Sequence, residues 1–167
     1  MTSLAAVIID AFEFARTGRV LDGTISLVEF PRLLDMLHEF EGELHVRIEG
    51  QTDQERKSWL LVTGNGSVVL KCQRCLERLS FPVSISSRLQ LRAADVTEIA
   101  WSDEALDDDA YDIISASQPW AVKDLLEDEV ILLLPVSPTH DVCDLPDSGV
   151  SDQKPSPFAV LAKLKKH

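Results

Sequence analysis

The stretch KCQRCL, Lys71–Leu76, lies between two runs of alternating apolar residues. Residues 67–71 form the end of the first run, and in the second, Phe81–Leu91, apolar side chains recur mostly at every second position. Alternation of this kind is typical of strands that bury one face and leave the other in water. The stretch therefore predicts a turn between two neighbouring strands, with both of its cysteines on the turn.

Other segments continue the strand pattern toward the N-terminus. Residues 43–49 alternate cleanly between apolar and charged side chains, and residues 20–28 alternate around a glycine. Residues 58–63 form a further apolar run, followed by Gly64-Asn65-Gly66, which predicts a tight turn before residues 67–71. Strands spaced this closely, with no helices between them, imply antiparallel pairing.

Two longer segments have helical spacing. Residues 4–16 repeat apolar side chains every three to four positions between Ser3, a suitable N-cap, and Gly18, a suitable stop. Residues 120–134 predict a second helix that ends before Pro135 and buries Trp120, Leu125, Val130 and Leu134. Pro31 suits the first turn of a short helix through residues 36–38. We therefore expect an α+β fold, a curved antiparallel sheet of about five strands flanked by these two long helices.

The domain organisation follows from changes in composition. Residues 1–140 are expected to form one α+β domain, because 167 residues suffice for one core. Residues 95–118 are acidic and weakly periodic, which predicts a mobile loop with a short strand near residues 111–114. Residues 141–167 are expected to form an extended arm, with a short amphipathic helix at 157–166.

Charge is sorted along the chain. The net charge is −12, yet residues 71–92 carry five basic side chains and one acidic one, whereas residues 95–153 carry 16 acidic side chains and one lysine. Such a chain lacks the positive field of a general nucleic-acid binder, and its acidic segment suits a basic protein partner. The basic residues either contact phosphates or an acidic partner, or form a solvated strand edge. They are Lys71, Arg74, Arg78, Arg88 and Arg92.

The cysteines and one histidine have metal-ligand spacing. Cys72 and Cys75 form a C-x-x-C pair, and His140 and Cys143 form an H-x-x-C pair. Together they would complete the four soft ligands of a structural zinc site and fix the C-terminal arm to the central turn. The alternative is a pair of reduced thiols beside an exposed histidine. A redox role is less favoured, because no βαβ unit surrounds the pair.

Several function classes find no support in the sequence. It contains no G-x-S-x-G elbow, P-loop, H-E-x-x-H motif or glycine-rich dinucleotide loop, so we expect no enzyme activity and no small-molecule substrate. No apolar run is long enough to span a bilayer, and the N-terminal run lacks the basic start of a signal peptide. With three cysteines, these features predict a cytoplasmic protein without membrane partners.

Three blocks carry a family resemblance. The run VVLKCQRCLERLSFPVSISSRLQL, residues 68–91, resembles the C-x-R-C-L strand-turn-strand of the YceD family, the large ribosomal RNA subunit accumulation proteins. The run LLEDEVILLLPVSPTHDVC, residues 125–143, is similar to that family's acidic-apolar helix and proline-rich turn. The ending KPSPFAVLAKLKKH is similar to the C-terminal signature of proteobacterial members.

The resemblance implies a non-enzymatic role in the synthesis, processing or stability of large-subunit (23S) ribosomal RNA. The expected partners are ribosomal RNA, basic ribosomal proteins or assembly factors. The alternative is a zinc-stabilised adaptor that binds proteins without touching RNA.

Overall fold

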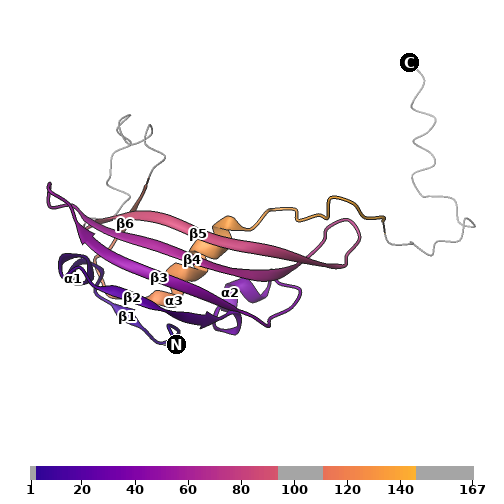
Figure 1. Ribbon diagram of the computed structural model, residues 1–167, viewed down its shortest axis with the longest axis horizontal. Coiled ribbons are helices and arrows are strands. Elements are labelled where there is room, and N and C mark those ends of the chain that lie inside the picture. The colour runs from indigo at the N-terminus through magenta and orange to yellow at the C-terminus, as the bar shows by residue number, and fades with distance from the viewer. Residues whose placement is uncertain (1–2, 94–110, 146–167) are drawn as a thin grey trace, which may run out of the picture.

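A five-stranded sheet dominates the computed structural model, which describes residues 3–93 and 111–145 (Figure 1). The strands, in the order in which they lie in the sheet, are β2 (Val20–Ser26), β3 (Glu43–Thr52), β4 (Ser58–Lys71), β5 (Arg78–Arg92) and β6 (Asp112–Ser115). The pairs from β2 to β5 are antiparallel, and β6 is parallel to β5. The predicted α+β class is confirmed, and the predicted antiparallel sheet of about five strands is confirmed except for β6, which is parallel to its neighbour.

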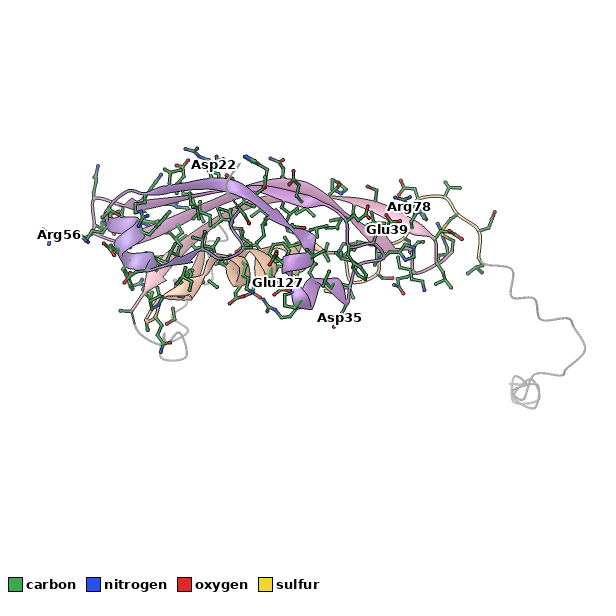
Figure 2. All side chains as sticks on the ribbon, turned by 90° about the horizontal axis from the view of Figure 1, so that it is seen from below. Asp22, Asp35, Glu39, Arg56, Arg78 and Glu127 are labelled. Atoms are coloured by element: carbon green, nitrogen blue, oxygen red, sulfur yellow. The ribbon has the colours of Figure 1, made fainter. Side chains whose placement is uncertain are left out.

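The sheet has one covered face and one open face. The covered face, called the inner face, packs against α1 (Ala11–Arg16) and α3 (Val122–Leu133), and α2 (Pro31–Leu34) packs on α3. Alternate strand residues are buried there, among them Leu44, Val46, Ile48, Leu60, Val62, Val83 and Ile85. The residues between them form the outer face. Figure 2 shows Asp22 on the outer side of the sheet and Glu127 on the side of the helices.

The predicted helix over residues 4–16 is wrong in its first half. Helix α1 starts after Asp10, whose side chain accepts a hydrogen bond of 2.9 Å from the Glu13 N–H. The preceding residues are extended, and β1 (Ile8–Ile9) pairs with β7 (Trp120–Ala121). β-Branched residues at positions 7–9 favour this extended backbone, and Asp is among the best N-caps.

The predicted turn at Gly64-Asn65-Gly66 is also wrong. Strand β4 runs without interruption through these residues and pairs with β5 along residues 59–71. A Cβ atom at Gly66 would lie 3.0 Å from the Glu43 carbonyl oxygen and collide with the Leu44 side chain. Gly66 therefore permits close approach of β3 to β4. Close approach of another backbone is a common reason for a glycine inside a strand.

The remaining boundaries shift by a few residues. The strand predicted over 20–28 ends at Ser26 and passes into a 3₁₀ turn, η1 (Leu27–Glu29), and α2 ends at Leu34 rather than near His38. Trp120 precedes α3 and is half-buried in β7, whereas Val130 and Leu134 are buried as predicted. Helix α3 also buries Val122, Leu126 and Glu127.

Parts of the acidic loop and of the C-terminal arm lie outside the described residues. The short strand expected near residues 111–114 is present as β6. The amphipathic helix predicted at 157–166 falls beyond the described range, which ends at residue 145. Among the helices that the structure describes, none combines the length and apolar character needed to cross a membrane.

Replacing Gly50 with alanine should destabilise the fold. A Cβ atom on Gly50 would lie 2.7 Å from the Ala15 Cα and collide with the Phe14 backbone, so α1 would have to move off β3. Overpacking of this kind costs about 1–3 kcal/mol. Chemical denaturation would measure the loss. Equal stability of the Gly50 variant and wild type would contradict this packing.

Candidate metal centre

The turn between β4 and β5 holds its two cysteines on one side. The Cys72 N–H donates to the Glu77 carbonyl at 2.9 Å, and the Leu76 N–H donates to the Cys72 carbonyl at 3.0 Å. Leu76 adopts a left-handed conformation with φ of 66°, which is uncommon for a residue other than glycine. This compact backbone turns the chain back within six residues and brings Cys72 and Cys75 to the same side.

The chain after α3 runs back to this turn (Figure 1). Pro135 and Pro138 follow the helix and keep the segment extended. The Gln73 N–H donates to the Pro138 carbonyl at 2.8 Å, and the His140 Nε2 lies 3.0 Å from the Arg78 carbonyl oxygen. These two contacts place residues 140–143 against the tip of the β4–β5 hairpin.

Four side chains meet there and form what we call the Cys3His cluster: Cys72, Cys75, His140 and Cys143. Their ligand atoms all lie within 4.8 Å of one another. The Cys72 and Cys143 Sγ atoms are 3.8 Å apart, and the Cys75 Sγ is 3.3 Å from the His140 Nδ1. A tetrahedral zinc with Zn–S bonds of about 2.3 Å has ligand–ligand edges of roughly 3.8 Å. The cluster therefore could hold a metal ion, and its donor set is that of a structural zinc site.

The surroundings act differently on the three thiols. Burial raises the pKa of the Cys143 thiol, but hydrogen bonds with Arg74 and His140 outweigh burial and lower that pKa. A backbone hydrogen bond at Glu77 lowers the pKa of the Cys75 thiol, but burial and the two neighbouring thiols outweigh it and raise that pKa. Burial raises the pKa of the Cys72 thiol, but hydrogen bonds from the backbone at Cys75, His140 and Arg74 outweigh burial and lower that pKa to about 5.

The carbonyl of Arg78 can only accept, so the His140 Nε2 carries the proton and Nδ1 faces the thiols. Such a carbonyl contact is the usual way in which proteins fix the tautomer of a ligating histidine.

Arg74 lies inside this arrangement rather than on the surface. Its Nε donates to the Cys143 Sγ at 3.0 Å, and its Nη2 donates to the His140 carbonyl at 2.6 Å. Three thiolates and one divalent ion leave a net charge of −1, which the guanidinium offsets. From the sequence alone, Arg74 groups with the other cations as a contact residue for RNA or a partner. Its position between Cys72 and Cys75 in the sequence was the missed signal for a role in the cluster.

The other four predicted contact residues lie on the outer face. Arg78 is 3.2 Å from the Glu39 carboxylate, and the two residues lie side by side in Figure 2. The Arg88 guanidinium lies 4.1 Å above the Trp59 ring. Lys71 and Arg92 are exposed, and Lys71 is the register partner of Arg78. The structure thus separates one arginine at the cluster from four cations along β4 and β5.

Replacing Arg74 with methionine should weaken zinc binding by about 10–100-fold, the usual effect of removing a residue that supports metal ligands. The loss arises because the Cys143 thiolate and the His140 carbonyl both lose their donor. Competition with a chromophoric zinc chelator would measure it. Arg78→Met removes the same charge four residues away and should leave affinity within about twofold. Equal affinities for the two variants would contradict the role of Arg74.

Comparison with known families identifies a matching family model. The model of the family described as large ribosomal RNA subunit accumulation protein YceD matches residues 61–165. That range contains most of β4, all of β5 and α3, and the four residues of the Cys3His cluster. No solved structure matches the chain. The match covers more than half of the 167 residues, and the chain therefore belongs to the YceD family of large ribosomal RNA subunit accumulation proteins.

Proposed function

We propose that this protein is a non-enzymatic factor of ribosome biogenesis that supports the synthesis, processing or stability of 23S ribosomal RNA in the cytoplasm. The observation that carries the proposal is the family match over residues 61–165, because the family is named for accumulation of large-subunit ribosomal RNA. Ribosomal RNA, basic ribosomal proteins and assembly factors are the partners that the proposal names.

The Cys3His cluster is proposed to hold a structural zinc. Four protein ligands fill a tetrahedral zinc and leave no open position for a substrate, which supports a non-enzymatic role. In this scheme residues 1–140 form the domain, and the zinc fixes the start of the arm, residues 141–167, to the β4–β5 hairpin through Cys143.

The charge distribution supports two kinds of contact. Residues 71–92 carry five basic side chains, and the four of them on the outer face fit phosphate or an acidic partner. Residues 95–153 carry 16 acidic side chains, which fit basic ribosomal proteins. Attraction between opposite charges speeds association with such partners, and repulsion between like charges disfavours others.

Removal of the gene should test this proposal directly. Cells that lack the protein should accumulate less 23S RNA relative to small-subunit ribosomal RNA, and a plasmid copy of the wild-type gene should restore the ratio. Northern blots and sucrose-gradient profiles would report the two subunits separately. An unchanged ratio of the two ribosomal RNAs in the deletion strain would refute the proposal.

A protein adaptor without RNA contact is a second candidate, which exposed apolar side chains favour. Val136 and Val142 are 104% and 91% exposed, and Leu132 and Leu145 are also largely exposed. Val136 and Met36 line a groove beside the cluster, together with Pro135. Crosslinking in cells, scored separately for RNA and for protein partners, would distinguish the two: an adaptor yields protein adducts alone.

A further inference from the structure

Four cations of the outer face lie in one row along the β4–β5 hairpin. Arg78, Arg88 and Arg92 are separated by even numbers of positions on β5, so their side chains project from the same face. Lys71 on β4 is the register partner of Arg78, and the Arg78 guanidinium also lies 3.2 Å from the Glu39 carboxylate. All four are exposed, and we call them the cation row. At about 3.4 Å per residue the row extends over roughly 45 Å of strand.

Small polar side chains fill the space between the ends of the row. Strand β5 contributes Ser80, Ser84 and Ser86, and β4 contributes Thr63, Asn65 and Ser67. All six side chains are exposed. Hydroxyl and amide groups can donate to or accept from phosphates, sugars and bases. The outer face of β4 and β5 therefore offers a surface of short, hydrogen-bonding side chains between two pairs of positive charges.

The neighbouring strands carry the opposite charge. Asp22, Glu43 and Glu49 lie on the outer face of β2 and β3. Arg47, on the same face, is already held by the Glu49 carboxylate at 2.5 Å and by Asp22 at 3.5 Å. A polyanion is thus repelled from β2 and β3 and attracted to β4 and β5. We call the outer face of β4 and β5 the track.

One position on the track has the geometry of a base-stacking site. The Trp59 Nε1 donates to the Asp53 carboxylate at 2.9 Å, and Tyr111 meets the Trp59 ring edge-on with centroids 5.1 Å apart. The fixed indole supports the Arg88 guanidinium, which lies 4.1 Å above it, and Arg88 is exposed. Proteins that bind single-stranded RNA commonly stack bases on such guanidinium planes.

We propose that the outer face of β4 and β5 binds single-stranded RNA, with phosphates along the cation row and a base stacked on the Arg88 guanidinium. The inference deepens the proposed function, since it rests on ribosomal RNA as the target. An acidic protein would satisfy the cations but would make no use of the guanidinium plane. The combination of a long cation row, hydroxyl groups and a supported guanidinium matches a sugar-phosphate chain with bases.

Fluorescence anisotropy with a labelled 12-nucleotide oligouridine would test the proposal on the full-length protein. Arg88→Gln and Arg88→Lys should each weaken binding on the order of tenfold, the equivalent of about one stacked base. Arg92→Gln should weaken binding and reduce the slope of log affinity against log salt by about 0.7, the value for one lost phosphate contact with a single strand. Arg16→Gln, an exposed position on α1, is the matched control and should bind like wild type.

Each outcome is decisive for the surface. Wild-type affinity of Arg88→Lys for oligouridine would overturn the stacking site. Wild-type affinity of both Arg88→Gln and Arg92→Gln would overturn RNA binding by the outer face of β4 and β5. Polyglutamate that binds as tightly as oligouridine would assign the face to acidic proteins instead. Thermal melts check that the variants are folded, and Arg92→Gln, which removes no packing on Trp59, keeps the test valid if the Arg88 variants are unstable. Absence of oligouridine binding by a protein that still restores 23S RNA in cells would refute this inference alone.

Discussion

Replacing Cys72 with serine is expected to abolish stoichiometric zinc binding and to lower the Tm by about 10 °C. Cys72 is fully buried, and its Sγ lies 3.8 Å from that of Cys143. A ligand present at about 1,000 times its Kd stabilises the folded state by about 4 kcal/mol, and one kcal/mol shifts the Tm of a domain of this size by about 2–4 °C. Elemental analysis and differential scanning calorimetry would measure the two effects.

His140→Gln provides a version of the same experiment with a matched control. It removes the one nitrogen ligand of the cluster, and we expect the same loss of zinc as with Cys72→Ser. His45→Gln changes a histidine on the outer face that is 3.4 Å from Asp22 and far from the cluster in the sheet, so zinc content should stay at one per chain. Wild-type protein whose Tm is insensitive to a strong chelator would contradict a structural zinc.

Replacing Glu127 with alanine should lower the free energy of unfolding by about 1–3 kcal/mol, the usual cost of leaving a buried donor without its acceptor. Glu127 is 2% exposed, and its carboxylate accepts hydrogen bonds from the Arg32 N–H at 2.5 Å, the Leu33 N–H at 3.0 Å and the Arg32 Nε at 2.7 Å. These bonds join the first turn of α2 to α3. The variant would leave the buried Leu33 N–H without an acceptor, whereas the Arg32 side chain, which is 53% exposed, can reach water. Urea denaturation would measure the loss.

Asp128→Ala is the matched control, because Asp128 binds the same arginine at 2.7 Å from an exposed position. Exposed pairs contribute about 0–1 kcal/mol, so this variant should be close to wild type. A similar loss in free energy of unfolding for Glu127→Ala and Asp128→Ala would show that the burial of Glu127 adds nothing to its contact with Arg32.

The Glu127 contact should also make stability depend on pH. Burial raises the pKa of the Glu127 carboxyl, but hydrogen bonds from Arg32 and the Leu33 N–H outweigh burial, and the pKa lies below its usual value. A group with a lowered folded pKa stabilises the protein fully above its unfolded pKa and loses this effect as the pH falls. The Tm difference between wild type and Glu127→Gln should therefore shrink below about pH 4.5. A difference that stays constant down to pH 3.5 would contradict this assignment.

The sheet and each half of the cluster were predictable because each follows from a short-range pattern. Alternation of apolar residues at Phe81–Leu91 fixes which face of β5 is buried, whatever the rest of the chain does. Cys72 and Cys75 lie on the turn that the flanking alternation demands, and His140 and Cys143 were the remaining pair with similar spacing.

The errors arose where tertiary contacts override local preference. The spacing of residues 4–9 fits a helix, yet pairing of β1 with β7 keeps these residues extended. Gly64 and Gly66 suit a turn, yet both lie in the middle of β4, where the approach of β3 requires small residues. The inward orientation of Arg74 depends on the backbone of residues 140–141, which no local pattern near position 74 reveals.

The long sequence separation within the Cys3His cluster has a consequence for biosynthesis. Cys75 and His140 are 65 positions apart, and all strands of the large sheet precede His140 in the chain. Because synthesis proceeds from the N-terminus and domains fold as they emerge, the ribosome releases the whole sheet before the second half of the cluster. A metal would thus be captured only after the sheet has been made, and a chain truncated before residue 140 would keep every strand of the large sheet but lack two of the four candidate ligands.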